Sequence, residues 1–112
     1  AGPVEAIDLM AVQPRGVVAA LTPWNDPVAV ACGLIGAALV TGNTVVHKPS
    51  ERSPATGWLL ARLLDEHLPA GVLSLVTGGP RVGATLAAQP VDVVAHVGST
   101  ATGRAGAAPR GR

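Results

Sequence analysis

The stretch that decides the fold is GVVAALTPWNDPVAVACGLIGAALVTGNTVVHKPSE, residues 16–51. It begins and ends with short apolar runs, residues 16–21 and 44–47, and between them lies a longer run of small apolar residues, 27–40. Short runs that are almost continuously apolar are typical of parallel strands covered on both faces. The longer run is typical of a helix that crosses from one strand to the next. The stretch therefore predicts one strand–helix–strand unit.

The same alternation continues along the chain. Further apolar runs predict strands at 72–76 and 91–97. The longer Ala/Leu stretches between the strands predict helices at 54–67, where leucines recur at helical period, and at 81–88. Right-handed crossovers fold such a series into an open sheet. We therefore expect an α/β fold of order βαβαβαβ, a partial doubly wound, Rossmann-like parallel sheet incomplete at both ends. It would cover residues 16–104, with a connecting segment at 1–15 and a truncated helix or tail at 105–112.

Capping residues stand at the expected helix ends. Asn25 or Asp26 precedes one helix and Ser53 another, each followed by a proline, which predicts side-chain N-caps. Gly42 follows the first helix and predicts a left-handed stop. The predicted sheet would have two open edges, an aggregation hazard that points to a truncated chain.

Composition limits the class of protein. The 112 residues suffice for one domain or part of one, and with 48% hydrophobic against 13% charged residues the chain is not disordered. A formal net charge of +1 gives no reason to expect nucleic acid as a partner. The longest apolar stretch, residues 28–40, is too short to span a membrane. We expect a soluble cytoplasmic chain whose partner is a small molecule, with no nucleic acid and no membrane.

Cysteine and histidine are sparse. The single cysteine, Cys32, excludes an internal disulfide, and its apolar neighbours predict a small buried packing residue. His47, His67 and His96 lack the spacing of metal ligands, so no metal site is expected.

Each predicted strand is followed by a polar or glycine-rich turn, at residues 22–25, 48–51, 77–83 and 98–103. Ligands of doubly wound sheets bind outside the carboxyl ends of the strands, so these turns predict a cofactor cleft. Lys48 and Glu51 can hydrogen-bond a ribose, and Gly98 and Ser99 begin a helix whose N-terminus suits a pyrophosphate. The glycines of residues 78–83 do not have the spacing of the dinucleotide fingerprint.

The four turns with their flanks, residues 17–25, 42–51, 68–83 and 91–104, resemble the coenzyme-binding half of the aldehyde dehydrogenase superfamily, whose phosphate turn is also non-standard. The resemblance implies an NAD(P)-dependent oxidation of an aldehyde to a carboxylic acid. It implies a catalytic role for Asn25, whose amide would donate to the oxyanion formed on the substrate. Full family enzymes are commonly dimers or tetramers.

The resemblance also implies cofactor contacts. Lys48 and Glu51 would hold the adenosine ribose, and a glutamate there usually favours NAD, with NADP possible. The residues that match cofactor-binding positions are Thr22, Pro23, Trp24, Lys48, Pro49, Ser50, Glu51, Gly79, Pro80, Gly83, Gly98 and Ser99.

Some family features are missing or altered. The catalytic cysteine, in a Gly-Gln-x-Cys context, and the general-base glutamate would both match positions beyond Arg112, so we expect no turnover from this chain alone. Asp26 stands where a large apolar residue is common, and His96 where an aromatic is common.

Alternatives exist for the roles of single residues and for the function of the whole chain. From the residues alone, Lys48 and Glu51 could form a surface ion pair, Asn25 could be only a helix cap, and Trp24 could be a core anchor or a cleft wall. The chain could be a non-catalytic nucleotide-binding or interaction module. It could also be a fragment of an acyl-CoA or acyl-phosphate reductase of the same fold, although the Pro23-Trp24-Asn25 turn favours the aldehyde oxidiser.

Overall fold

The structure, a computed structural model, describes residues 2–99, 101, 103 and 104. Strands and helices alternate in this part of the chain as predicted, and their ends lie within a few residues of the expected ones. The elements are β1 (Val17–Leu21), α1 (Pro27–Val40), β2 (Thr44–Lys48), α2 (Pro54–Asp65), β3 (Leu73–Leu75), α3 (Pro80–Ala88) and β4 (Val93–His96). The helix or tail expected at 105–112 lies outside the described residues.

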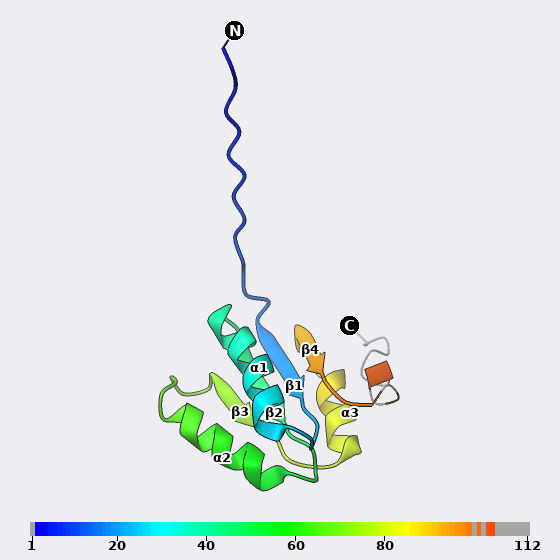
Figure 1. The fold of residues 1–112 in the computed structure, drawn as a ribbon. Coiled ribbons are helices and arrows are strands. Elements are labelled where there is room, and N and C mark those ends of the chain that lie inside the picture. The colour runs from blue at the N-terminus through cyan, green and yellow to red at the C-terminus, as the bar shows by residue number, and fades with distance from the viewer. Residues whose placement is uncertain (1, 100, 102, 105–112) are drawn as a thin grey trace.

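The sheet is parallel throughout, with strand order β3-β2-β1-β4 (Figure 1). The register pairs Leu21 at the end of β1 with Lys48 of β2 on one side and with His96 of β4 on the other. The carboxyl ends of three strands are therefore level with one another. The chain runs outward from β1 to β2 and β3, then returns to place β4 on the other side of β1. This makes the gap between β1 and β4 a topological switch point.

Helices cover the sheet from different sides. Helices α1 and α2 contact each other, α1 packs on β1 and β2, and α2 packs on β3, whereas α3 contacts β1 and lies apart from the other two helices (Figure 1). The core joins Val18 and Val45 of the sheet to Ala31, Ile35 and Ala38 of α1. Because most of these side chains are small, the helix axis can approach the strands closely.

The end of α1 is built as predicted. Gly42 has φ +90°, its N–H donates to the Leu39 carbonyl (3.0 Å), and the Asn43 N–H donates to the Ala38 carbonyl (3.0 Å). This pair of bonds is a Schellman motif, which closes the helix and turns the chain into β2.

The predicted side-chain N-caps are wrong. Asp26 and Ser53 occupy the N-cap positions of α1 and α2, but neither side chain makes a cap hydrogen bond. A capping side chain needs extended backbone at its own residue. Asp26 is left-handed (φ 48°, ψ 51°), and Ser53, with ψ 48°, also falls outside the extended region. The side chains are therefore not aimed at the helix N–H groups.

The prediction that Cys32 is buried is also wrong, because its side chain is exposed. Helix α1 is apolar on every side, so its periodicity could not show which face packs on the sheet. The inward face is Ala31, Ile35 and Ala38, and Cys32 lies about 100° around the helix from Ala31.

Residues 2–15 form no helix or strand, are exposed, and extend away from the sheet (Figure 1). They join the body at Asn43, whose Oδ1 accepts the N–H groups of Arg15 (2.7 Å) and Gly16 (2.9 Å). Within the described residues, none of the helices has the length and apolar character to cross a bilayer.

Candidate functional site

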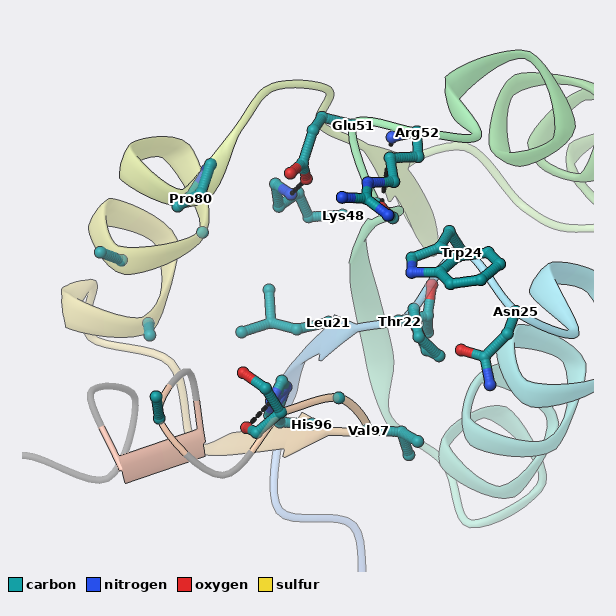
Figure 2. A pocket seen from close by; sticks show the side chains of 18 of the residues that line it. Leu21, Thr22, Trp24, Asn25, Lys48, Glu51, Arg52, Pro80, His96 and Val97 are labelled. Carbon is teal, nitrogen blue, oxygen red and sulfur yellow. Dashed lines mark hydrogen bonds and ion pairs between the residues drawn. The ribbon is translucent and has the colours of Figure 1, made fainter.

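A pocket of about 960 Å³ lies where β1, β2 and β4 end and α3 begins (Figure 2). It therefore includes the switch point between β1 and β4, which is where the sheet topology favours a ligand. Its volume is in the upper part of the range found for small-molecule sites. The lining residues are Leu21, Thr22, Pro23, Trp24, Asn25, Lys48, Ser50, Glu51, Arg52, Pro80, Arg81, Gly83, Ala84, Ala87, His96, Val97, Gly98, Ser99 and Ala101.

All the residues proposed from the sequence line this pocket except Pro49 and Gly79. Pro49 is buried against α2, where a Cβ added at Gly57 would lie only 2.5 Å from Pro49 Cγ. Gly79 is the N-cap of α3. Both residues lie in the turns that carry their neighbours into the pocket, and they are not among the residues that line it.

Lys48 is a buried cation at the end of β2. Its side chain is 8% exposed, its Nζ donates to the Pro49 carbonyl (3.1 Å), and the same atom lies 3.9 Å from Glu51 Oε2. Glu51 is half exposed at the pocket wall. The alternative of a surface ion pair therefore does not describe Lys48. An ammonium group has three donors, so this one can still donate to a bound molecule.

Behind the pocket wall, Thr22 and His47 are both buried, and Thr22 Oγ1 is hydrogen-bonded to His47 Nε2 (2.8 Å). Burial, and after it the adjacent Lys48 ammonium, lower the pKa of His47 to about 4. The imidazole is therefore neutral at pH 7 and adds no second positive charge beside Lys48. Sequence reasoning missed this pair, although a histidine within an apolar strand needs a buried hydrogen-bond partner.

Trp24 and Asn25 come from the turn between β1 and α1. The Trp24 side chain is 55% exposed, so it is a cleft wall and not a core anchor, and the Arg52 guanidinium carbon lies 5.7 Å from its ring centroid. Asn25 is exposed and is not the helix cap, since Asp26 holds that position. Figure 2 shows the Asn25 amide projecting beside Trp24 from the start of α1. The amide is thus available to a molecule in the pocket.

The opposite wall is the turn after β4. His96 Nε2 lies 3.5 Å from the Ser99 carbonyl, and a Cβ added at Gly98 would be 2.6 Å from His96 Cε1. A side chain at position 98 would therefore collide with the His96 imidazole in its present position. Ser99 starts a helical turn, because its carbonyl accepts the N–H of Gly103 (3.0 Å).

Several lining residues were not proposed from the sequence. Pro80, Ala84 and Ala87 lie at helical spacing along one face of α3, and this signal could have found the two alanines. Nothing in the sequence pattern distinguished Arg52 from other exposed arginines. The lining residues missed in this way are Leu21, Arg52, Arg81, Ala84, Ala87, His96, Val97 and Ala101.

The charges of the lining favour an anionic ligand. Lys48, Arg52 and Arg81 face a single acidic residue, Glu51, among the residues of the lining. In the described part of the chain, His, Cys, Asp and Glu side chains form no cluster that could hold a metal ion. Fold and site together define a doubly wound α/β unit of the nucleotide-binding type, with a polar cleft at its switch point.

Comparison with known proteins gives the family. A sequence model described as the aldehyde dehydrogenase family matches residues 4–109, and the chain belongs to this family. It is 49% identical over 94 residues to 3-succinoylsemialdehyde-pyridine dehydrogenase of a Pseudomonas species, covering 81% of this chain and 20% of that protein. It is 46% identical over 95 residues to the NADP/NAD-dependent aldehyde dehydrogenase PuuC of Escherichia coli, covering 82% and 19%. The chain thus spans about a fifth of the length of these relatives.

Solved structures share the fold. An NAD-dependent aldehyde dehydrogenase from Sinorhizobium meliloti matches with a TM-score of 0.76 and 42% identity, over 84% of this chain and 20% of that one. A betaine aldehyde dehydrogenase variant from Staphylococcus aureus, in complex with NAD⁺, matches with a TM-score of 0.80 and 37% identity, over 84% and 19%. The expected Rossmann-like fold and family are therefore both confirmed.

Proposed function

We propose that this chain forms part of the coenzyme-binding unit of an NAD(P)-dependent aldehyde dehydrogenase, which oxidises an aldehyde to a carboxylic acid. The observation that carries the proposal is that Lys48, Glu51, Asn25 and the Gly98–Ser99 turn line the same pocket. These side chains come from three strand ends that are far apart in the sequence. They have the chemistry needed for a ribose, a pyrophosphate and a developing oxyanion.

The residues present fit a dinucleotide. A buried ammonium beside a half-exposed carboxylate offers donors and acceptors to the two hydroxyls of a ribose. Gly83 leaves open the space between α3 and the Lys48 stem, because an added Cβ would lie 3.6 Å from Lys48 Cδ. The excess of cations over Glu51 suits a pyrophosphate. When bound, the nicotinamide cofactor accepts the hydride that leaves the substrate.

Asn25 is the proposed catalytic group of this chain. A side-chain amide held at the start of a helix can donate to negative charge that develops on the aldehyde oxygen, and donors of this kind act best when they are fixed in advance. Pro23 has a fixed φ angle, and α1 begins two residues after Asn25, so the backbone is restricted on both sides of this amide. Similarity to 3-succinoylsemialdehyde-pyridine dehydrogenase and to the aldehyde dehydrogenase PuuC favours an aldehyde oxidiser over an acyl-CoA or acyl-phosphate reductase.

Cys32 is not assigned as the nucleophile. It lies on the exposed face of α1 and is not among the residues that line the pocket. We therefore propose that this chain supplies coenzyme contacts and the oxyanion donor, and that by itself it does not turn over aldehyde.

Calorimetric titration of the chain with NAD⁺ tests the coenzyme role. Lys48→Met should weaken binding about tenfold or more, since a charge-assisted hydrogen bond is lost. Arg62→Gln is the matched control, because Arg62 is an exposed cation on α2 that stacks on Trp58, away from the pocket. Equal affinities for the native chain and Lys48→Met would contradict the proposed coenzyme site.

The catalytic role of Asn25 requires the rest of the enzyme. We would graft residues 16–104 into a full-length relative and follow aldehyde-dependent NADH formation. In that chimera Asn25→Ala should lower kcat by about 10²–10³, the usual cost of losing one oxyanion donor. A chimera that binds NAD⁺ and keeps its kcat after Asn25→Ala would overturn this assignment.

A further inference from the structure

Arg52 lies one residue beyond Glu51 and lines the same pocket. Its backbone N–H donates to Ser50 Oγ (3.2 Å), which fixes the turn, and its guanidinium carbon stands 5.7 Å from the centroid of the Trp24 ring. In Figure 2 the Arg52 side chain lies between the Lys48–Glu51 pair and the Trp24 ring. An exposed arginine is thus held against the part of the pocket that suits a ribose.

Within residues 2–99, 101, 103 and 104, the Arg52 side chain has no hydrogen bond and no carboxylate within 4 Å, and its guanidinium carbon lies at cation–π distance, 5.7 Å, from the centroid of the Trp24 ring. A cation–π contact uses none of the five N–H donors of a guanidinium, which stay in the plane of the group. That planar fork matches a phosphate with two parallel hydrogen bonds, which an ammonium group cannot do.

Glu51 would be expected to repel a phosphate placed at the ribose. However, Lys48 Nζ lies 3.9 Å from Glu51 Oε2 and is nearly buried, so the carboxylate is already partly compensated on the protein side. The next cation along the chain is Arg52. A phosphate beside this ribose would therefore meet one compensated carboxylate and one arginine without an acidic partner.

We propose that Arg52 binds the 2′-phosphate of NADP⁺, so that this pocket accepts NADP⁺ as well as NAD⁺ in spite of Glu51. The inference rests on the proposed function, because it assigns the adenosine ribose to the Lys48–Glu51 end of the pocket. It makes Arg52 a residue that determines coenzyme specificity. Arg62, which stacks on Trp58 in a similar way at 5.0 Å but lies outside the pocket, has no such role.

The test compares two nucleotides that differ only in the 2′-phosphate, adenosine 5′-monophosphate and adenosine 2′,5′-bisphosphate, by calorimetric titration of the whole chain. NAD⁺ and NADP⁺ are titrated as the second pair. Arg52→Gln should weaken binding of the bisphosphate and of NADP⁺ about tenfold, the order expected for a lost charge-assisted pair at an exposed site. It should leave the monophosphate and NAD⁺ within about twofold. Arg52→Lys, which keeps the charge and loses the fork, should fall between, and Arg62→Gln should change neither.

Four results would overturn the inference. Arg52→Gln could weaken both members of each pair equally, which would make Arg52 a general electrostatic contact. The bisphosphate could lose affinity in Arg81→Gln and keep it in Arg52→Gln, which would place the phosphate at α3. If the native chain bound the monophosphate and NAD⁺ but neither 2′-phosphorylated partner, the inference alone would fail. Failure of the native chain to bind any of the four nucleotides would refute the proposed coenzyme site, and this inference with it.

Discussion

The buried imidazole of His47 makes the stability of this chain depend on pH in a direction and amount that can be worked out. His47 is 2% exposed, and burial together with the neighbouring Lys48 ammonium lowers its pKa to about 4. In the unfolded chain the imidazole titrates near its ordinary value of about 6.5. Between these two values the unfolded chain binds a proton that the folded chain does not. The free energy of unfolding therefore falls as the pH falls through this window.

The two pKa values set the size of the effect. Linkage gives a loss of about 2 kcal/mol between pH 7.5 and pH 5, and a limit of about 3 kcal/mol below pH 4, for this one residue. The loss is present only at acidic pH. Above about pH 7 both states hold a neutral imidazole, so His47 adds no pH dependence there.

Urea unfolding followed by circular dichroism across this pH range measures the effect. In His47→Gln the side chain does not titrate and still offers Thr22 a hydrogen-bond partner. Between pH 7.5 and pH 5 the native chain should therefore lose about 2 kcal/mol more of its free energy of unfolding than this variant does. His67→Gln is the control, because His67 is exposed beyond the end of α2. If His47→Gln and the native chain show parallel pH profiles, or if the His47 ring protons titrate near pH 6.5 by NMR, the reasoning is refuted.

Three further substitutions test the packing of the fold by urea unfolding at neutral pH. Asn43→Ala removes the acceptor for the N–H groups of residues 15–16 and should cost about 2–4 kcal/mol, and a cost below about 1 kcal/mol would mean that water replaces the side chain. Gly57→Ala would force a Cβ to within 2.5 Å of Pro49 Cγ and should destabilise by about 1–3 kcal/mol. Gly33 is exposed on α1, and a Cβ added there would meet nothing within 4 Å, so Gly33→Ala should instead stabilise the chain by about 0.5–1 kcal/mol. If the two glycine substitutions changed the free energy of unfolding in the same direction, this description of the packing would be contradicted.

Local chemistry determined much of the fold in advance. Prolines and glycines act on their own backbone, so Pro27, Pro54 and Gly42 marked helix ends that the structure reproduces almost to the residue. The strand positions were also predicted closely, because β1 is continuously apolar and the two valines of β2 follow closely on the Gly42 stop. The side-chain caps were not predictable, since the dihedral angles of Asp26 and Ser53 depend on how each turn packs.

Which face of a helix packs on the core could be predicted from the sequence for only some of the helices. In α2 the polar residues reveal an outward face, and Leu60 and Leu64 pack on the core while Leu59 and Leu63 are half exposed. Helix α1 has no polar residue to orient it, so the exposure of Cys32 could not be deduced from spacing alone.

Some features of the candidate site could be predicted from the sequence, and others depend on the tertiary structure. The sequence by itself determined which turns carry chemistry, because the polar residues that follow each strand are a local property and the sheet rule sends them to one edge. Only the tertiary structure decided that β4 lies beside β1, so that Leu21 and His96, at the ends of these two strands, both line the pocket. It also decided that Lys48 is buried, that Thr22 meets His47, and that Arg52 lies against Trp24. Strand order and contacts across the sheet depend on the free energy of packing the whole chain, and no single segment of sequence contains that information.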